Sequence, residues 1–158
     1  ADNVYRLNGR ARYRGVEFSL QGHLTGALSL AASAMWLHAR QVAATDPSLV
    51  GKAPENTPRA TASLFAQYDL AAIPGFSLNA GGYYTARRAV NNANQAWIGG
   101  YTLFTAGWRY LTRIGGRPAT LQLNIENLGD KHYWSAAGSN QLAVGLGRTA
   151  MLSTTVDF

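Results

Sequence analysis

Two adjacent arginines and a nearby tryptophan are the residues of this chain best suited to hold a charged ligand. Arg87 and Arg88 are followed in the same polar stretch by Trp97. A guanidinium forms charge-assisted hydrogen bonds to anions, and an aromatic face adds stacking or a cation–π contact. The group therefore predicts contact with an anionic ligand. An arginine pair at the end of a strand also suits phosphate groups on a membrane surface or a neighbouring loop, so these alternatives stay open.

A second candidate contact group consists of the consecutive residues His132, Tyr133 and Trp134. It follows a segment, residues 121–126, in which leucine and isoleucine alternate with glutamine, asparagine and glutamate. An Asn-Leu-Gly-Asp turn separates that segment from the aromatic residues. The group could contact a ligand or anchor the rim of the structure.

Catalytic and metal-binding chemistry finds no support in the sequence. Serines such as Ser33 and Ser63 have no histidine and acid that would act with them as a nucleophile. His23 and His38 belong to no histidine and carboxylate cluster with ligand spacing, and there is no cysteine. We therefore predict a protein that is not an enzyme and that has no metal site or covalently bound cofactor.

The charge pattern argues against nucleic acid as a partner. Twelve arginines and two lysines stand against eight acidic residues, which gives a formal net charge of +6. The basic residues are scattered between strand-like segments, whereas nucleic-acid-binding proteins cluster them. Only 14% of residues are charged, roughly half the usual share of about 25% in soluble domains. The chain therefore has few charges with which to cover a water-facing surface.

The elements that must position these residues are strands. Apolar and polar residues alternate in seven long segments, with a further short segment at residues 4–7. The long segments begin near residues 16, 28, 60, 76, 104, 121 and 148. One face is apolar, with aromatic residues towards the strand ends: Trp36, Tyr68, Tyr84, Trp108 and Tyr110.

The opposite face is rich in serine, threonine, glutamine, asparagine and glycine, and carries the isolated charges Glu17, Arg109 and Glu126. A soluble barrel or sandwich would instead place lysine, glutamate and aspartate on a water-facing side. A polar but weakly charged face suits a sheltered lumen, and no apolar run reaches the roughly 18–20 residues of a membrane helix. The alternation therefore favours an all-β, antiparallel transmembrane barrel wall.

The connections support this interpretation because short and long ones alternate. Tight turns are expected at residues 25–26, 73–75 and 114–117, and long polar loops at 44–58, 89–99 and 129–147. Outer-membrane barrels have short turns at one end and long external loops at the other. The candidate ligand contacts then lie in or beside residues 44–58, 87–99 and 129–147, at one end of the sheet.

Three segments resemble the TonB-dependent outer-membrane receptors, siderophore-receptor branch. "ARYRGVEFSLQGHLTGALSL" is similar to a strand of that family that begins Arg-x-x-Gly-Val-Glu, and "GKAPENTPRATASLFAQYDL" resembles its Gly…Pro-x-Asn-x-Pro loop and following strand. "LNIENLGDKHYW" resembles the final Asn-Leu-x-Asp-x-x-Tyr segment, and Phe158 resembles the terminal aromatic residue of outer-membrane proteins. Together these segments span nearly all of the chain from Ala11.

The resemblance implies a bacterial outer-membrane protein that imports a ferric siderophore. Family members have a plug domain followed by a barrel of about 22 strands, so residues 1–158 are expected to be a C-terminal barrel segment without the plug. It implies as partners the siderophore, the TonB system through the plug, and outer-membrane lipid and lipopolysaccharide, whose phosphates suit the arginine pair. In the family, the segment with His132, Tyr133 and Trp134 is chiefly structural.

One alternative follows from chain length. Roughly 150 residues also suffice for a complete barrel of about eight strands, whose interior side chains just fill. Such a barrel would have a structural or adhesive role. It requires the first ten residues to supply an additional strand, and "ADNVYRLNGR" has few alternating positions.

Overall fold

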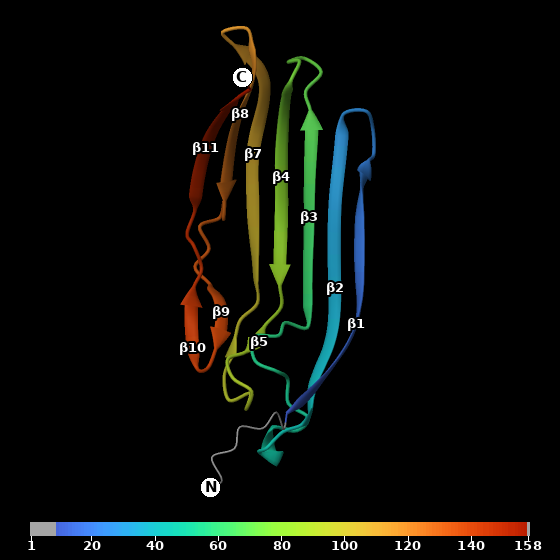
Figure 1. Ribbon diagram of the computed structural model, residues 1–158, viewed down its shortest axis with the longest axis vertical. Coiled ribbons are helices and arrows are strands. Elements are labelled where there is room, and N and C mark those ends of the chain that lie inside the picture. Colours follow the sequence, from blue (N-terminus) through green and yellow to red (C-terminus); the bar gives the residue numbers. More distant parts are fainter. Residues whose placement is uncertain (1–8, 158) are drawn as a thin grey trace.

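Seven long antiparallel strands lie side by side in the order in which they occur along the chain (Figure 1). The computed structural model describes residues 9–157, so the possible strand at residues 4–7 and the terminal Phe158 lie outside the described residues. The seven strands are β1 (Arg10–His23), β2 (Leu28–Ala43), β3 (Ala60–Asp69), β4 (Phe76–Thr85), β7 (Tyr101–Ile114), β8 (Arg117–Glu126) and β11 (Thr149–Val156). The sheet predicted from the alternating pattern is confirmed.

Short elements within the long loops were not predicted. The loop before β3 contains a 3-10 helix (Pro47–Leu49). The next long loop contains a hairpin of β5 (Arg88–Ala89) and β6 (Trp97–Ile98), and the last one contains a hairpin of β9 (Trp134–Gly138) and β10 (Gln141–Val144). The polar composition of these loops conceals their local order.

The register places side chains on the two faces that the sequence predicts. One cross-strand row contains Leu28, Tyr68, Leu78, Trp108, Leu123 and Leu152. The adjacent row, on the opposite face, contains Ser29, Gln67, Asn79, Gly107, Asn124 and Met151. Because successive side chains in a strand point to opposite faces, one face is apolar and the other largely polar.

The apolar face is not covered by any other part of the described chain. Val16 and Trp36 on this face are 71% and 67% exposed, and no large side chain among residues 9–157 is fully buried. Near the tight turns, Phe76 stacks on Trp108 with ring centroids 5.8 Å apart. Exposed apolar surface bordered by aromatic residues is typical of a membrane barrel rather than of a water-facing sheet.

The two ends of the sheet differ as predicted. The tight turns lie at one end, and the long loops with β5, β9 and β10 lie at the other (Figure 1). Gly75, in the β3–β4 turn, has a φ of +82°, and a Cβ there would collide with the carbonyl oxygen of Leu111. Glycine therefore permits both the left-handed backbone and the close approach of the neighbouring strand.

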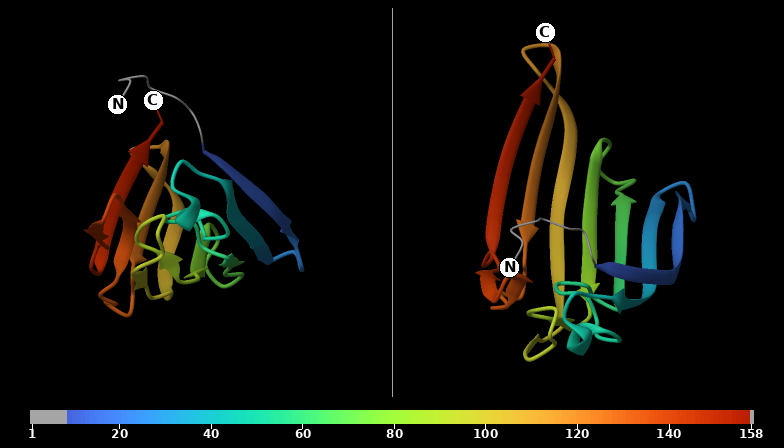
Figure 2. Two further views of the ribbon diagram at one scale, coloured as in Figure 1. Left: turned by 90° about the horizontal axis from the view of Figure 1, so that it is seen from below. Right: turned by 60° about the horizontal axis from the view of Figure 1, so that its bottom comes forward.

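The sheet bends into a curved wall with two open edges (Figure 2). Within residues 9–157, β1 pairs only with β2 and β11 pairs only with β8. The described residues therefore do not form the closed barrel of about eight strands that chain length had allowed. None of the helices described in residues 9–157 is long and apolar enough to span a membrane.

Candidate ligand-binding site

The long loops come together at one end of the wall and form a single structure, which we call the loop cluster. It comprises residues 44–59, 86–100 and 127–148. Its small apolar centre contains Val90 and Ile98 from the second loop and Ala137 from the third, all buried. The candidate ligand contacts are therefore placed by contacts between loops that are far apart in sequence.

Asparagine side chains hold the first loop to the second. The Asn94 Oδ1 accepts a hydrogen bond from the Ala53 backbone N–H at 2.9 Å, and the Asn94 Nδ2 donates to the Ala53 carbonyl at 2.8 Å. Beside this pair, the Lys52 Nζ donates to the Ala93 carbonyl at 2.8 Å. Asn94 has a φ of +55°, a left-handed conformation that asparagine tolerates better than most residues.

The third loop is attached to both of the others. The Asn56 Oδ1 accepts from the Ala137 backbone N–H at 3.2 Å, which links the first and third loops. The Asn91 Nδ2 donates to the Asn140 Oδ1 at 2.7 Å, which links the second and third. Each of the three loops is therefore hydrogen-bonded to both of the others.

The structure brings Arg87 and Trp97 together as the sequence suggests. Both side chains are exposed, and the guanidinium carbon of Arg87 lies 5.2 Å from the centre of the Trp97 ring. This arrangement is a cation–π contact in which Arg87 keeps a surface open to an anion. The two residues form an accessible positive and aromatic patch on the second loop.

Arg88 has a different environment from its neighbour. It is only 4% exposed, its Nη2 donates to the carbonyl of Trp134 at 3.1 Å and also to that of Ser135, and its guanidinium lies 5.6 Å from the Tyr101 ring centre. Its Nε is buried and has no partner within the described residues. The structure thus places Arg88 against a neighbouring loop, one of the alternatives that the sequence left open.

His132, Tyr133 and Trp134 of the third loop differ in how far they are buried. His132 is exposed, and Trp134 is about half exposed. The half-buried Tyr133 ring lies 4.3 Å from the Tyr101 ring, centre to centre. Burial raises the pKa of the Tyr133 hydroxyl, and the neighbouring Tyr101 and Glu126 add to the shift. Only Trp134, through its carbonyl, contacts the arginine pair directly.

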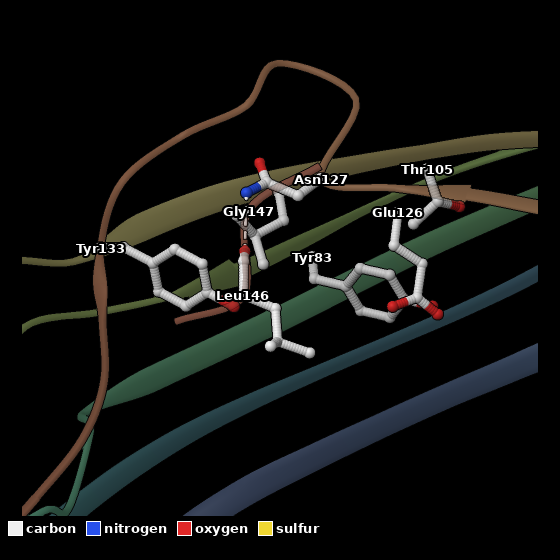
Figure 3. Close-up of a pocket in the computed structure, with 8 residues that line it drawn as sticks. Tyr83, Thr105, Glu126, Asn127, Tyr133, Leu146 and Gly147 are labelled. Atoms are coloured by element: carbon white, nitrogen blue, oxygen red, sulfur yellow. Dashed lines mark hydrogen bonds between the residues drawn. The ribbon is translucent and has the colours of Figure 1, made fainter. Parts of the chain in front are cut away.

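A pocket of about 220 Å³ lies where the third loop meets the polar face of the sheet (Figure 3). Its lining consists of Tyr83, Leu103, Thr105, Glu126, Asn127, Tyr133, Leu146 and Gly147. Except for Tyr133, none of these residues was among the predicted ligand contacts. Alternation did place Tyr83, Thr105 and Glu126 on the polar face, and that was the available signal, but the sequence did not show that the third loop folds towards them.

Asn127 organises the loop that closes this pocket. It is 4% exposed; its Nδ2 donates to the Lys131 carbonyl at 2.9 Å and to the Leu146 carbonyl at 3.0 Å, and its Oδ1 accepts from the Lys131 N–H at 2.9 Å. Nearby, the Arg148 N–H donates to the Asp130 Oδ1 at 2.9 Å, which lowers the pKa of that carboxyl. The Asn-Leu-Gly-Asp turn therefore joins both ends of the third loop.

An exposed apolar face, a polar inner face and long loops gathered at one end define this chain as part of the wall of an outer-membrane β-barrel receptor. The family described as "TonB dependent receptor-like, beta-barrel" matches residues 1–128. The chain belongs to this family of outer-membrane transporters, which are not enzymes. The predicted family, cellular location and absence of an enzymatic function are thereby confirmed.

The chain is similar to several siderophore receptors. It is 32% identical to the ferrichrome outer membrane transporter/phage receptor of Escherichia coli, over 79% of this chain and 17% of that protein. An uncharacterized TonB-dependent receptor of Haemophilus influenzae is 31% identical over 99% of this chain and 49% of its own length. The crystal structure of BauA, the ferric preacinetobactin receptor of Acinetobacter baumannii, superimposes with a TM-score of 0.88 at 30% identity, covering 96% of this chain and 23% of that one.

These alignments also show how much of a receptor the chain represents. It spans about half of the Haemophilus influenzae relative and roughly a fifth of the two named siderophore receptors. Its seven-stranded wall therefore corresponds to part of their barrels.

Proposed function

We propose that this chain is a C-terminal barrel segment of a receptor that imports a ferric siderophore across the outer membrane, with energy supplied by the TonB system. In this proposal the plug domain, through which TonB acts, lies outside residues 1–158. The loop cluster faces the medium and makes first contact with the ferric chelate. The similarity to ferrichrome and ferric preacinetobactin receptors supports this assignment.

The observation that carries the proposal is the exposed contact between Arg87 and Trp97 on the loop cluster. Many ferric chelates are anionic, and a guanidinium supported on an aromatic ring offers both charge and a flat surface for stacking. Arg88, His132, Tyr133 and Trp134 belong to the same proposed site in different roles. Arg88 positions the third loop, His132 and Trp134 lie at its rim, and Tyr133 lines the pocket behind it.

Substitution of Arg87 tests this function. In the receptor that contains this chain, we expect Arg87→Ala to weaken the binding of an anionic ferric chelate about tenfold, since hydrogen bonds to charged groups contribute about 1.5–3 kcal/mol. The probes are ferric citrate and a ferric catecholate, which are anionic, and a ferric trihydroxamate, which is uncharged and serves as the neutral comparison. Binding is measured by tryptophan fluorescence on the purified receptor, and transport by uptake of radiolabelled iron.

Arg113→Ala is the matched control, because Arg113 is also exposed but lies on β7 near the tight turns, at the opposite end of the wall. It should leave binding unchanged. A wild-type receptor that binds none of the probes would contradict the proposed function. Unchanged affinity in Arg87→Ala would instead assign Arg87 to lipopolysaccharide phosphates.

A further inference from the structure

The pocket behind the loop cluster contains a carboxylate that no other described residue neutralises. Glu126 is the last residue of β8, and its side chain lines the pocket and remains exposed (Figure 3). Within residues 9–157 its carboxylate makes no side-chain hydrogen bond and no ion pair. A carboxylate without a partner among the described residues therefore lies where the polar face meets the third loop.

Two tyrosines share the pocket with this carboxylate. Tyr83, on β4, and Tyr133, on the third loop, both line the same pocket. Glu126 is the only carboxylate among the described residues that line the pocket. A carboxylate in a pocket that tyrosine rings also line is a suitable environment for an organic cation, which can gain an ion pair and a cation–π contact.

Glycine in the third loop allows Tyr133 to take this position. A Cβ at Gly145 would collide with the ring of Tyr133, and the Gly145 N–H donates to the Tyr133 carbonyl at 2.8 Å. The loop backbone therefore lies directly against the ring and holds it on the side of the pocket. Arg88 contacts Tyr101, the ring packed on Tyr133, and donates its hydrogen bonds to backbone carbonyls rather than to Glu126.

The volume of the pocket limits what it can hold. Pockets that enclose a whole drug-sized molecule measure roughly 300–1,000 Å³, whereas this one measures about 220 Å³. It is therefore too small for a complete ferric chelate but large enough for one arm of such a ligand.

We propose that Glu126, Tyr83 and Tyr133 form a subsite for an ammonium group carried on an arm of the ferric chelate. This inference rests on the proposed function and specifies its substrate class: a chelate whose iron-binding part meets Arg87 and Trp97 and whose cationic arm reaches the polar face. The receptor then selects amine-bearing chelates over otherwise identical ones without the charge.

A pair of chelates that differ only in this charge tests the subsite. The probes are a ferric tris-catecholate, whose iron-binding part is anionic, with a free terminal primary amine on one arm, and the same compound with the amine acetylated. On the purified receptor that contains this chain, we expect the amine form to bind about tenfold more tightly. Glu126→Gln should abolish the preference by weakening the amine form alone. Tyr83→Leu should reduce the preference, whereas Tyr83→Phe, which keeps the ring, should retain it.

Glu17→Gln is the control, because Glu17 is a glutamate of β1 on the same polar face but is not among the residues that line the pocket. It should leave the preference intact. Equal binding of both probes by the wild type, or an equal loss of both in Glu126→Gln, overturns the subsite. If the wild type binds neither probe but binds ferric chelates without an amine, the subsite alone fails. If it binds no ferric chelate, the proposed function fails as well.

Discussion

Arg88 shows how a charged residue can serve structure rather than recognition. Its guanidinium is buried, and it donates to the carbonyl groups of Trp134 and Ser135, which are the first two residues of β9. No carboxylate is hydrogen-bonded to it within the described residues. The carbonyl groups carry only a partial negative charge and do not neutralise the guanidinium fully. The cation–π contact with the Tyr101 ring adds to its stabilisation.

We expect Arg88→Met to loosen the β9–β10 hairpin while the rest of the wall stays folded. The methionine keeps the apolar stem but leaves the two carbonyls without their donor, and an unsatisfied buried polar group costs about 1–3 kcal/mol. Amide hydrogen exchange in residues 134–144 should become roughly tenfold faster or more. Arg87→Met, at the exposed neighbouring position, is the control and should leave exchange in the hairpin unchanged. Unaltered exchange in Arg88→Met would show that the hairpin does not depend on this contact.

The sequence could identify the arginine pair but not the difference between its members. Arg87 lies just before β5 and its side chain is exposed, whereas Arg88, the first residue of β5, contacts the third loop. That distinction depends on residues 134–135, which are more than forty positions away along the chain. The alternating pattern likewise predicts that Glu126 lies on the polar face. It does not predict the pocket, because the pocket forms only where Tyr133 of the third loop folds over that face.

At the scale of elements, asparagine side chains turn three flexible-looking loops into one unit. Asn94 makes two hydrogen bonds with Ala53, and Asn140 accepts one from Asn91. Asparagine suits this task because it offers a donor and an acceptor and tolerates a left-handed backbone, which both Asn94 and Asn140 adopt. Side-chain hydrogen bonds therefore link each of these loops to its neighbour.

We expect Asn94→Gly to separate the first loop from the second. Glycine keeps the left-handed backbone accessible but removes both hydrogen bonds, a loss of about 2 kcal/mol at about 1 kcal/mol each. Spin labels at Ser48 and Gln95 should then report a broader distance distribution between the two loops.

Asn140→Gly is the matched control for this measurement. It changes the same residue type in the same backbone conformation, but breaks a contact between the second and third loops. The Ser48–Gln95 distance should therefore stay narrow. If both variants broaden it equally, the contacts between the loops are not specific to each pair.

Periodicity predicted the long strands because their alternation is a local property of the sequence. It could not predict β5, β6, β9 and β10, which are short and lie in polar segments. Contacts such as Asn94 with Ala53 join residues 41 positions apart, so no local pattern encodes them. The long strands also extend beyond the predicted segments: β1 begins at Arg10 and β2 continues to Ala43.

At the scale of the whole molecule, the separation of turns and loops predicts the orientation of the wall. Outer-membrane barrels place short turns on the periplasmic side and long loops outside. The chain has no cysteine, so single labels can test this arrangement. In a receptor background without other reactive cysteines, we expect Ser48→Cys to react in intact cells with a polyethylene-glycol maleimide too large to cross the outer membrane.

Ala72→Cys provides the opposite end for comparison, because Ala72 is exposed in the tight turn between β3 and β4. It should react only after the outer membrane is permeabilised. Labelling of Ala72→Cys but not Ser48→Cys in intact cells would reverse the orientation, and with it the placement of the ligand-binding site.

Each long strand of the wall pairs with the next long strand along the chain, so the sheet can assemble from contacts between neighbours in sequence. The entropy lost in closing a loop rises by only about 0.6 kcal/mol for each doubling of loop length. By this rule the connection through residues 127–148 costs only about 2 kcal/mol more than a two-residue turn. The outer edges of β1 and β11 are different, since their backbone groups can be satisfied only by strands distant in sequence or outside the described residues. Pairing inside the wall therefore joins strands that are neighbours in sequence, whereas pairing at the outer edges of β1 and β11 is non-local. Non-local pairing is the slower kind of step in folding, so we expect it to be confined to these two edges.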